Sequence, residues 1–280
     1  MRRFDYLRPK SLKEALQLKK TIVGAKYISG GTDLIVQIKN RELQPSALIS
    51  LRSIPELATI EINGGARIGA LATISDLIQH LELGNNYPVL IEAAKRLGSV
   101  QIRNVATIGG NLCNCSPSAD MALPLLVLEA KIRLQAAKTS REIPLSEFFK
   151  GPGKSCLSSD EILTDILLDP PPQKAKATFL KKGRVKMDLA IASMAVLVEI
   201  EGGRCRKARI AAGSVAPIPL RLSKVETLLE SNAISRDLVS KAQQLARDIV
   251  SPITDVRATE EYRRHIVGVY VKRGLEKVFG

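Results

Sequence analysis

The 280-residue chain contains no tryptophan, and phenylalanine and tyrosine together make up only 4% of it. Proteins that bind single-stranded nucleic acid stack bases on aromatic side chains, so this composition argues against such a platform. The chain also has only two histidines, His80 and His265, which lie far apart in the sequence. Their scarcity disfavours a histidine-based metal site and a Ser–His–Asp catalytic triad.

Cysteine is scarce as well, with four residues and no C-x-x-C pair. Cys113 and Cys115 form a C-x-C pair, whereas an iron–sulfur cluster needs four thiolates. We therefore expect no metal site and interpret both residues as small, soft side chains in the wall of a pocket. Few cysteines suit a reducing cytoplasm. No apolar run reaches the roughly 18 residues of a membrane span, and no signal peptide is recognisable.

Positive charge is in excess, with a net charge of +14 at pH 7. Such an excess occurs in nucleic-acid-binding proteins, but also in proteins that meet acidic partners. The lysines and arginines are scattered, and their densest group lies between Lys174 and Lys186. A basic module that binds nucleic acid or protein without a cofactor is therefore an alternative, which salt-sensitive binding to a generic duplex would support.

Residues 1–55 predict a small βαβ unit whose parallel strands are 25–28 and 47–51. The first strand leads directly into Ser29-Gly30-Gly31, and Thr32 or Asp33 can cap the next helix. A strand, a glycine turn and a helix N-terminus in this order form an anion-binding arrangement. We therefore expect this turn to face a ligand.

Residues 56–172 predict a mixed sheet with helices. The Asn63-Gly64-Gly65 turn predicts a hairpin, Ser75 is expected to cap a helix, and Pro88 is expected to start another. The expected strands are 58–62, 66–70, 131–136, 142–145 and 161–168, and a further helix is expected over 121–129. The clearest boundary in the chain follows at Pro170-Pro171-Pro172.

Residues 173–280 predict an α+β domain, because strand-like segments come first and helical segments follow. Three antiparallel strands are expected over 177–181, 190–199 and 204–213. Three helices are expected over 222–230, 235–250 and 260–279.

The most unusual stretch runs from Ile102 to Asp120 and reads IRNVATIGGNLCNCSPSAD. It predicts a long polar loop, and loops with many small polar side chains are commonly functional. Its glycines would let backbone N–H groups approach a ligand closely. Ser118 or Asp120 could cap the helix that follows, and the Asp120 carboxylate could also accept hydrogen bonds from sugar hydroxyls. With Ser29–Leu34, this stretch could grip the two phosphates of one dinucleotide.

Two common phosphate-binding motifs are absent. No G-x-G-x-x-G follows the first strand, so there is no Rossmann fingerprint. Residues Gly151 to Ser155 resemble part of a Walker A loop, but the position five before Gly153 is Phe148 rather than glycine. We interpret this segment as a surface loop.

At these residues the chain resembles the FAD-binding medium subunits of the molybdenum hydroxylases, the group of xanthine dehydrogenase and aerobic carbon monoxide dehydrogenase. The matching segments keep their order and spacing over almost the whole chain. They are Ser29–Leu34, Ile102–Leu112, Ser116-Pro117-x-x-Asp120, Glu147–Gly151, Asp160–Leu163 and Phe179–Arg184. Two features depart from the family: Cys115 replaces a more usual alanine, and the ring-facing aromatic of some members is not obvious here.

The resemblance implies an α+β protein with a two-subdomain FAD-binding fold of the vanillyl-alcohol oxidase (PCMH) type. A C-terminal three-stranded antiparallel sheet with a helical bundle is expected to follow. The implied divisions are FAD-binding subdomain 1 over residues 1–55, subdomain 2 over 56–172, and the C-terminal domain over 173–280.

The resemblance also implies where FAD binds. The pyrophosphate would lie between two groups of residues: Ser29, Gly30, Gly31, Thr32 and Asp33 in the first, and Ala106, Thr107, Gly109, Gly110, Asn111 and Asn114 in the second. Asp120 is expected near the ribityl and adenosine hydroxyls, and Leu157 and Lys181 near the isoalloxazine ring. A lysine there could stabilise the anionic reduced ring. No catalytic acid or base is expected in this chain.

The implied function is electron transfer from the iron–sulfur clusters of a partner subunit to NAD or another acceptor. The expected partners are an iron–sulfur small subunit and a molybdopterin large subunit, in a heterotrimer or its dimer. They must be separate polypeptides, because this chain lacks four-cysteine motifs and the necessary length. A standalone FAD oxidoreductase is a second alternative, and it predicts NADH oxidation by the isolated chain.

Overall fold

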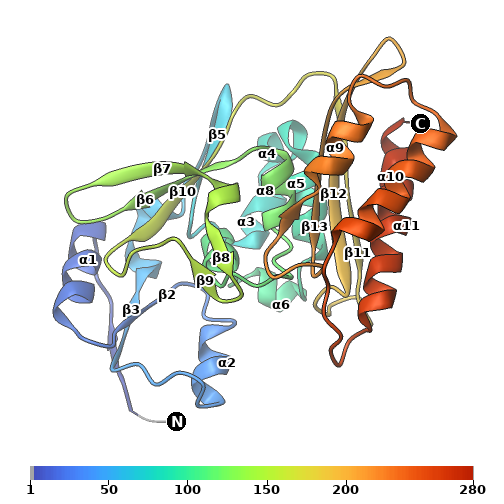
Figure 1. The fold of residues 1–280 in the computed structure, drawn as a ribbon. Helices are drawn as coiled ribbons and strands as arrows, with labels where there is room; N and C mark the ends of the chain where they lie inside the picture. Colours follow the sequence, from blue (N-terminus) through green and yellow to red (C-terminus); the bar gives the residue numbers. More distant parts are fainter. Residues whose placement is uncertain (1–2, 280) are drawn as a thin grey trace.

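A computed structural model describes residues 3–279 as an α+β protein with three main sheets (Figure 1). A small parallel sheet lies at the N-terminal end, a five-stranded antiparallel sheet in the middle, and a four-stranded antiparallel sheet at the C-terminal end. The largest core fills the space between the middle sheet and the C-terminal sheet. No helix in the described residues is long and apolar enough to cross a membrane.

The N-terminal sheet has the order β1-β3-β2, and both of its strand pairs are parallel. The predicted parallel pair is present, but β1 was not predicted, because three largely exposed residues carry no periodic pattern. Asp33 precedes α2 without a side-chain capping bond, so the predicted cap is wrong. The elements are β1 Asp5–Leu7, α1 Leu12–Thr21, β2 Lys26–Ile28, α2 Leu34–Lys39 and β3 Ala47–Ser50.

The middle sheet has the order β4-β5-β10-β6-β7 and is antiparallel throughout. One face buries Ile68, Ile132 and Ile166 in the main core. The elements of this region are β4 Ile60–Asn63, β5 Gly65–Gly69, α3 Ile74–Gln79, α4 Leu81–Asn86, α5 Pro88–Arg96, α6 Val100–Arg103, α7 Ile108–Cys113, α8 Ala122–Val127, β6 Lys131–Gln135, β7 Ser140–Pro144, β8 Phe149–Gly151, β9 Lys154–Ser155 and β10 Ile162–Leu168. Short 3₁₀ helices cover Leu51–Ser53, Pro55–Leu57 and Leu145–Glu147.

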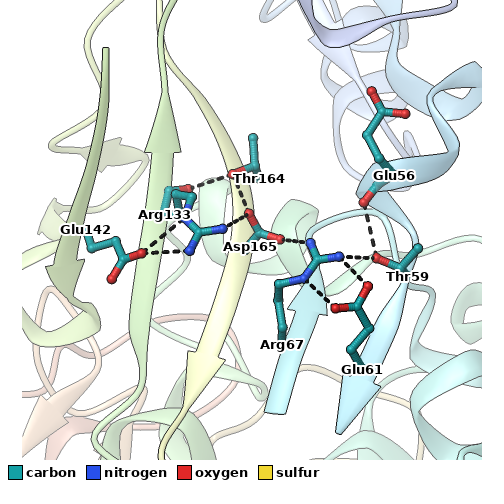
Figure 2. A network of polar contacts seen from close by, with 8 residues as sticks. All are labelled: Glu56, Thr59, Glu61, Arg67, Arg133, Glu142, Thr164 and Asp165. Atoms are coloured by element: carbon teal, nitrogen blue, oxygen red, sulfur yellow. Dashed lines mark hydrogen bonds and ion pairs between the residues drawn. The ribbon is translucent and has the colours of Figure 1, made fainter. Parts of the chain in front are cut away.

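The opposite face of the middle sheet carries a charged network centred on Asp165 of β10 (Figure 2). The buried Asp165 carboxylate accepts hydrogen bonds from Arg67 on β5 at 2.5 Å and from Arg133 on β6 at 3.3 Å. Each arginine also pairs with a more exposed carboxylate, Glu61 for the first and Glu142 for the second. The network therefore ties three adjacent strands together by their side chains.

Two predictions for the middle region are wrong in their details. The helix expected after Ser75 begins after Thr73, whose side chain forms a capping box with Asp76. The stretch expected to be one long polar loop contains α6 and α7. Glycine and polar residues masked the helical spacing of Ile108 and Leu112, which are both fully buried.

The segment expected as a surface loop is the short β8–β9 hairpin. Its tip contains Gly153 at a φ of +68°, with open space where a Cβ atom would lie. It has no strand–loop–helix context, so it does not form a Walker A site.

The C-terminal sheet runs in the order β11-β12-β13-β14 and is covered by helices on both faces. On β12, Ala195 and Leu197 face the main core, whereas Met194, Val196 and Val198 face a second core beneath α9–α11. Three strands were predicted, and the fourth contains only two residues. The elements are β11 Ala175–Lys182, β12 Ala192–Glu201, β13 Arg204–Gly213, β14 Leu220–Arg221, α9 Ser223–Leu229, α10 Arg236–Ile249 and α11 Glu260–Phe279.

Candidate cofactor site

The two glycine segments picked out from the sequence lie in direct contact. A Cβ atom on Gly30 would lie 2.2 Å from the Val105 carbonyl oxygen and 2.9 Å from Ala106 Cα, so only glycine permits this approach. Thr107 Oγ1 donates a hydrogen bond to Ser29 Oγ at 3.1 Å. The fold thus brings together two residues that are 78 positions apart in the sequence.

The first segment offers backbone donors. Within residues 3–279, the N–H groups of Gly30, Gly31, Thr32 and Asp33 donate no hydrogen bond to the chain. Gly31 has a φ of +76°, which turns the backbone between β2 and α2. Arg52 Nε donates to the Ser29 carbonyl oxygen at 3.1 Å and holds the end of the strand. This segment can therefore present successive N–H groups to an anion.

The second segment differs, because its N–H groups are already used. Ile108 N donates to Ala72 O at 3.0 Å, Gly109 N to Ala70 O at 2.9 Å, and Gly110 N to Thr107 Oγ1 at 3.1 Å. Gly109 is a packing glycine, since its Cβ atom would lie 2.6 Å from Ala70 Cβ. The segment therefore offers no free amides at Ile108, Gly109 or Gly110.

Gly110 lies where the second segment approaches Ser29 of the first segment. A Cβ atom there would lie 2.9 Å from both Ser29 Oγ and Thr107 Oγ1. A side chain at this position would therefore displace the two hydroxyls that join the segments. The absence of a side chain at Gly110 therefore permits the close approach of the two segments.

The other residues predicted on the second segment serve the surrounding structure. Ala106 is buried, and Asn114 ends α7. Asn111 Oδ1 accepts a hydrogen bond from Met121 N at 3.3 Å and so fixes the start of α8. Leu157, predicted near the ring, is partly buried against the main core just after the β8–β9 hairpin.

Asp120 and Lys181 form a buried ion pair between the middle region and the C-terminal sheet. Their carboxylate oxygen and ammonium nitrogen are 2.6 Å apart, and each side chain is only 5% exposed. Lys181 Nζ also donates to Arg96 O at 3.1 Å. Asp120 Oδ1 is buried without a hydrogen-bond partner in the described chain. An unpartnered buried carboxylate oxygen is costly, so the site is suited to a ligand donor.

Burial raises the pKa of Asp120 to about 6, and the Lys181 ammonium only partly opposes this rise. Asp120 does not cap α8, because Met121 occupies the capping position and makes no side-chain bond. Ser118 does not cap it either, and its hydroxyl lies 2.7 Å from Ser214 Oγ on the C-terminal domain side. The capping interpretation is therefore wrong.

Ser193 belongs to this neighbourhood and was missed in the sequence. It pairs with Lys181 across β11 and β12, and with Gly213 across β12 and β13. Directly paired residues point to the same face of a sheet, so Ser193 lies beside Lys181. Its buried hydroxyl has no hydrogen-bond partner in the described chain. A serine within an apolar strand does not by itself indicate a site, and only the strand register shows that Ser193 lies beside Lys181.

The cysteines do not form a metal centre in the described residues, where no group of three potential metal ligands is found. Cys115 packs in the main core, and burial together with the nearby Cys156 thiol raises the pKa of the Cys115 thiol to about 11. Cys113 is exposed. The two therefore lie in different surroundings, and Cys115 is a core residue rather than part of a pocket wall.

Comparison with known families accounts for both parts of the chain. Residues 2–171 match the family described as the FAD binding domain in molybdopterin dehydrogenase. Residues 177–278 match the family described as the CO dehydrogenase flavoprotein C-terminal domain. The chain belongs to the FAD-binding subunits of the molybdenum hydroxylase family. It is thus an FAD-dependent oxidoreductase subunit, and the predicted family and cofactor are confirmed.

Several members of the family are similar over nearly the full length of this flavoprotein subunit. The xanthine dehydrogenase FAD-binding subunit of Escherichia coli O157:H7 is 30% identical, with 98% of this chain and 95% of the relative covered. The carbon monoxide dehydrogenase medium chain of Afipia carboxidovorans is 33% identical, with 98% and 96% covered. A solved structure of carbon monoxide dehydrogenase from Hydrogenophaga pseudoflava superposes with a TM-score of 0.97 at 32% identity, covering 99% and 98% of the two chains.

The flavoprotein residues fit FAD on structural grounds as well. The free N–H groups after β2 suit phosphate oxygens, and Gly110 places no side chain against Ser29 at the start of that segment. The unpartnered oxygens of Asp120 and Ser193 suit hydrogen-bonding groups of the cofactor. Free backbone donors and unpartnered buried oxygens together suit a dinucleotide that carries phosphates and hydroxyl groups.

Proposed function

We propose that this chain is the electron-transfer subunit of a molybdenum-containing hydroxylase or dehydrogenase complex. In this proposal it takes electrons from the iron–sulfur clusters of a partner subunit and passes them to NAD or another acceptor. The observation that carries the proposal is the contact between the two glycine segments, which the hydrogen bond from Met121 N to Asn111 Oδ1 connects to the region of the buried Asp120–Lys181 pair. Nothing in this arrangement provides a nucleophile with an adjacent base, which fits a cofactor-holding role.

The first glycine segment would hold the pyrophosphate of FAD. Its four N–H groups from Gly30 to Asp33 donate to no acceptor in the described chain, which leaves them free to bind phosphate oxygens. The second segment would border the pyrophosphate at Gly110, beside the hydrogen bond that the Thr107 hydroxyl donates to Ser29 of the first segment. This division of roles differs from two equivalent phosphate-binding loops, because the amides of α7 are already satisfied.

The buried ion pair would orient the remainder of the cofactor. Asp120 would accept a hydrogen bond from a ribityl or adenosine hydroxyl at its free oxygen. Lys181 would place positive charge near the ring, and Ser193 would donate a hydrogen bond beside it. Bound FAD would supply the redox chemistry, whereas these residues bind, orient and tune it electrostatically.

The proposed partners are an iron–sulfur small subunit and a molybdopterin large subunit, in a heterotrimer or its dimer. Relatives named as medium chains support a place in a larger assembly. The proposed divisions are 1–55, 56–172 and 173–280, and the buried pair would bridge the last two. The four cysteines are all free thiols, which supports a cytoplasmic location.

The test is purification of the chain with its native partners, followed by quantification of FAD and iron. We expect one FAD per chain with iron in a co-purifying subunit, and reduction of the flavin when substrate reaches the molybdenum subunit. A flavin-free chain after reconstitution with FAD would contradict the proposal. Rapid NADH oxidation by the isolated chain, without co-purifying subunits, would instead identify a standalone oxidoreductase.

A further inference from the structure

Glu92 on α5 attaches this helix to the edge of the C-terminal sheet. Its carboxylate accepts hydrogen bonds from Phe179 N at 2.8 Å and from Thr178 Oγ1 at 3.2 Å, both on β11. An edge strand such as β11 presents N–H groups that no neighbouring strand accepts. Glu92 therefore supplies the acceptor for an amide that the sheet itself leaves unpaired.

Lys277 on α11 completes this contact. Its ammonium donates to Glu92 Oε1 at 3.1 Å and to Thr178 Oγ1 at 2.7 Å. We call Glu92, Thr178 and Lys277 the edge anchor, because together they fasten α5, β11 and α11. Without Glu92, the amide of the fully buried Phe179 would have no acceptor in the described chain. A buried donor without an acceptor is costly, so the contact between α5 and β11 would rearrange.

The same helix and strand also meet at Lys181. Arg96 is the last residue of α5 and lies four residues after Glu92, and its carbonyl oxygen accepts a hydrogen bond from Lys181 Nζ at 3.1 Å. The carbonyl end of a helix carries partial negative charge, which suits an ammonium group. On β11, Lys181 lies two residues after Phe179, so both side chains lie on the same face of the strand. The edge anchor and the Lys181 contact are therefore neighbouring joints between one helix and one strand.

The position of the Lys181 ammonium depends on its acceptors, because a lysine side chain is long and flexible. In the described chain these acceptors are Arg96 O on α5 and Asp120 Oδ2, the latter at 2.6 Å. A shift of α5 along or away from β11 would move the first acceptor. The ammonium would then follow it or lose it, and in both cases its contact with Asp120 would weaken.

We propose that Glu92 is a positioning residue that holds the Lys181 ammonium against Asp120 by fixing α5 to β11. Its effect on the cofactor rests on the proposed function, in which Lys181 and Asp120 contact FAD. Its effect on the ion pair rests only on the hydrogen bonds of the edge anchor and of Lys181.

The first test follows the titration of Asp120 in the full FAD-free chain, by carbon NMR of labelled aspartate carboxyl groups. Asp120→Asn identifies the signal. Burial raises the pKa of Asp120 to about 6 and the Lys181 ammonium opposes that rise, so displacement of the ammonium should raise the pKa further. Glu92→Ala should therefore shift the titration to higher pH, in the direction of Lys181→Met but by less. Glu92→Gln removes the same charge yet keeps an oxygen that accepts from Phe179 N, so it should titrate like the wild type.

The second test measures FAD affinity by flavin fluorescence, with and without Lys181. Glu92→Ala should lower the affinity about threefold or more, but less than Lys181→Met does. In the Lys181→Met background the same substitution should change the affinity by less than about twofold, because its effect passes through Lys181.

Glu226→Ala is the matched control for a general loss of stability. Glu226 on α9 likewise accepts from a strand amide, Ile210 N at 2.7 Å, and pairs with a basic side chain, Arg221, at 2.7 Å. It contacts β13, which lies two strands away from β11. This variant should unfold at lower urea concentration but keep the wild-type titration of Asp120 and the wild-type FAD affinity.

Several results would overturn the positioning role. They are a wild-type Asp120 titration in Glu92→Ala, an equal shift in Glu92→Gln or Glu226→Ala, and an equal loss of FAD affinity with and without Lys181. Should Glu92→Ala fail to fold, Lys277→Met takes its place, since the Lys277 side chain is 55% exposed. It should also raise the pKa of Asp120, and an unchanged titration would count against the proposal. A wild-type chain that binds no FAD, with Asp120 still shifted in Glu92→Ala, would refute the proposed function and leave the positioning of Lys181 standing.

Discussion

Gly30→Ala is the sharpest test of the contact between the two glycine segments. The added methyl group would lie 2.2 Å from the Val105 carbonyl oxygen, whereas close carbon–oxygen contacts lie at about 3.3 Å. The segments must therefore separate by about 1 Å. Overpacking of this kind costs about 1 to 3 kcal/mol. Loss of the hydrogen bond between Thr107 and Ser29 adds about 1 kcal/mol. We expect the free energy of unfolding to fall by about 2 to 4 kcal/mol.

FAD affinity is expected to fall with it, by about 100-fold, because a misplacement of about 1 Å disrupts a site built on fixed donors. Urea unfolding of the FAD-free chain measures the stability, and quenching of flavin fluorescence measures the affinity. Gly84→Ala on α4 is the control, since its nearest neighbour would lie 3.8 Å away. It should keep wild-type FAD affinity and gain about 1 kcal/mol at most from helix propensity.

Substitutions at Gly30 and Gly110 should differ in effect, because an added methyl group would meet backbone atoms at Gly30 and side-chain hydroxyls at Gly110. At Gly110 a methyl group meets only the Ser29 and Thr107 hydroxyls, which can rotate, so Gly110→Ala should cost less stability than Gly30→Ala. Gly110→Val should still block FAD, because its larger side chain occupies the ligand space. Wild-type FAD affinity in Gly30→Ala would refute the idea that this contact builds the site.

Three further predictions concern buried charges. Lys181→Met should lower FAD affinity at least tenfold and destabilise the FAD-free chain by about 3 kcal/mol, because Asp120 loses its partner. Equal urea unfolding midpoints for this variant and the wild type would contradict the loss of stability. The pKa of Asp120 is raised to about 6 from an ordinary 3.8, so the folded chain binds this proton more tightly than the unfolded chain does. Stability from this group is therefore lost as pH rises from about 4 to about 6, by about 3 kcal/mol, and Asp120→Asn should remove that slope in urea titrations. Asp165→Ala should cost about 3 kcal/mol by leaving Arg67 and Arg133 facing each other, with FAD binding unchanged in fluorescence titrations. A loss of FAD in this variant would show that the network reaches the site.

Long elements could be predicted from the sequence, whereas the shortest could not. The strand β12 has ten residues of nearly continuous apolar sequence. The helix α10 follows a capping serine, Ser235, and α11 is 20 residues long. The strands β1 and β14 have three and two residues, which is too short for any period to appear. The helix α7 was missed because its glycines weaken helical propensity, and burial of Ile108 and Leu112 overrides that weakness.

The candidate site was predictable in its parts but not in its assembly. Paired glycines after a strand indicate close backbone approach, and Gly30 and Gly109 both make such approaches. Whether the amide of such a glycine is free to bind a ligand depends on whether a distant part of the chain already accepts its hydrogen bond. The Gly109 amide bonds to Ala70, whereas the Gly30 amide has no acceptor in the described chain. Likewise, only the register of β11 and β12 places Ser193 beside Lys181.

The distribution of satisfied and unsatisfied groups indicates how FAD binding would act on stability. The α7 side of the site is complete without a ligand, since its amides and hydroxyls already bond within the protein. Two of the unsatisfied buried atoms, Asp120 Oδ1 and Ser193 Oγ, lie instead where the middle region meets the C-terminal sheet. A ligand that bonds to both would stabilise that junction, and binding to the folded state alone adds about 2.7 kcal/mol when FAD is at 100 times its Kd. FAD should therefore protect the amides of β11 and β12 from hydrogen exchange more than those of α7, and equal protection of both would contradict this division.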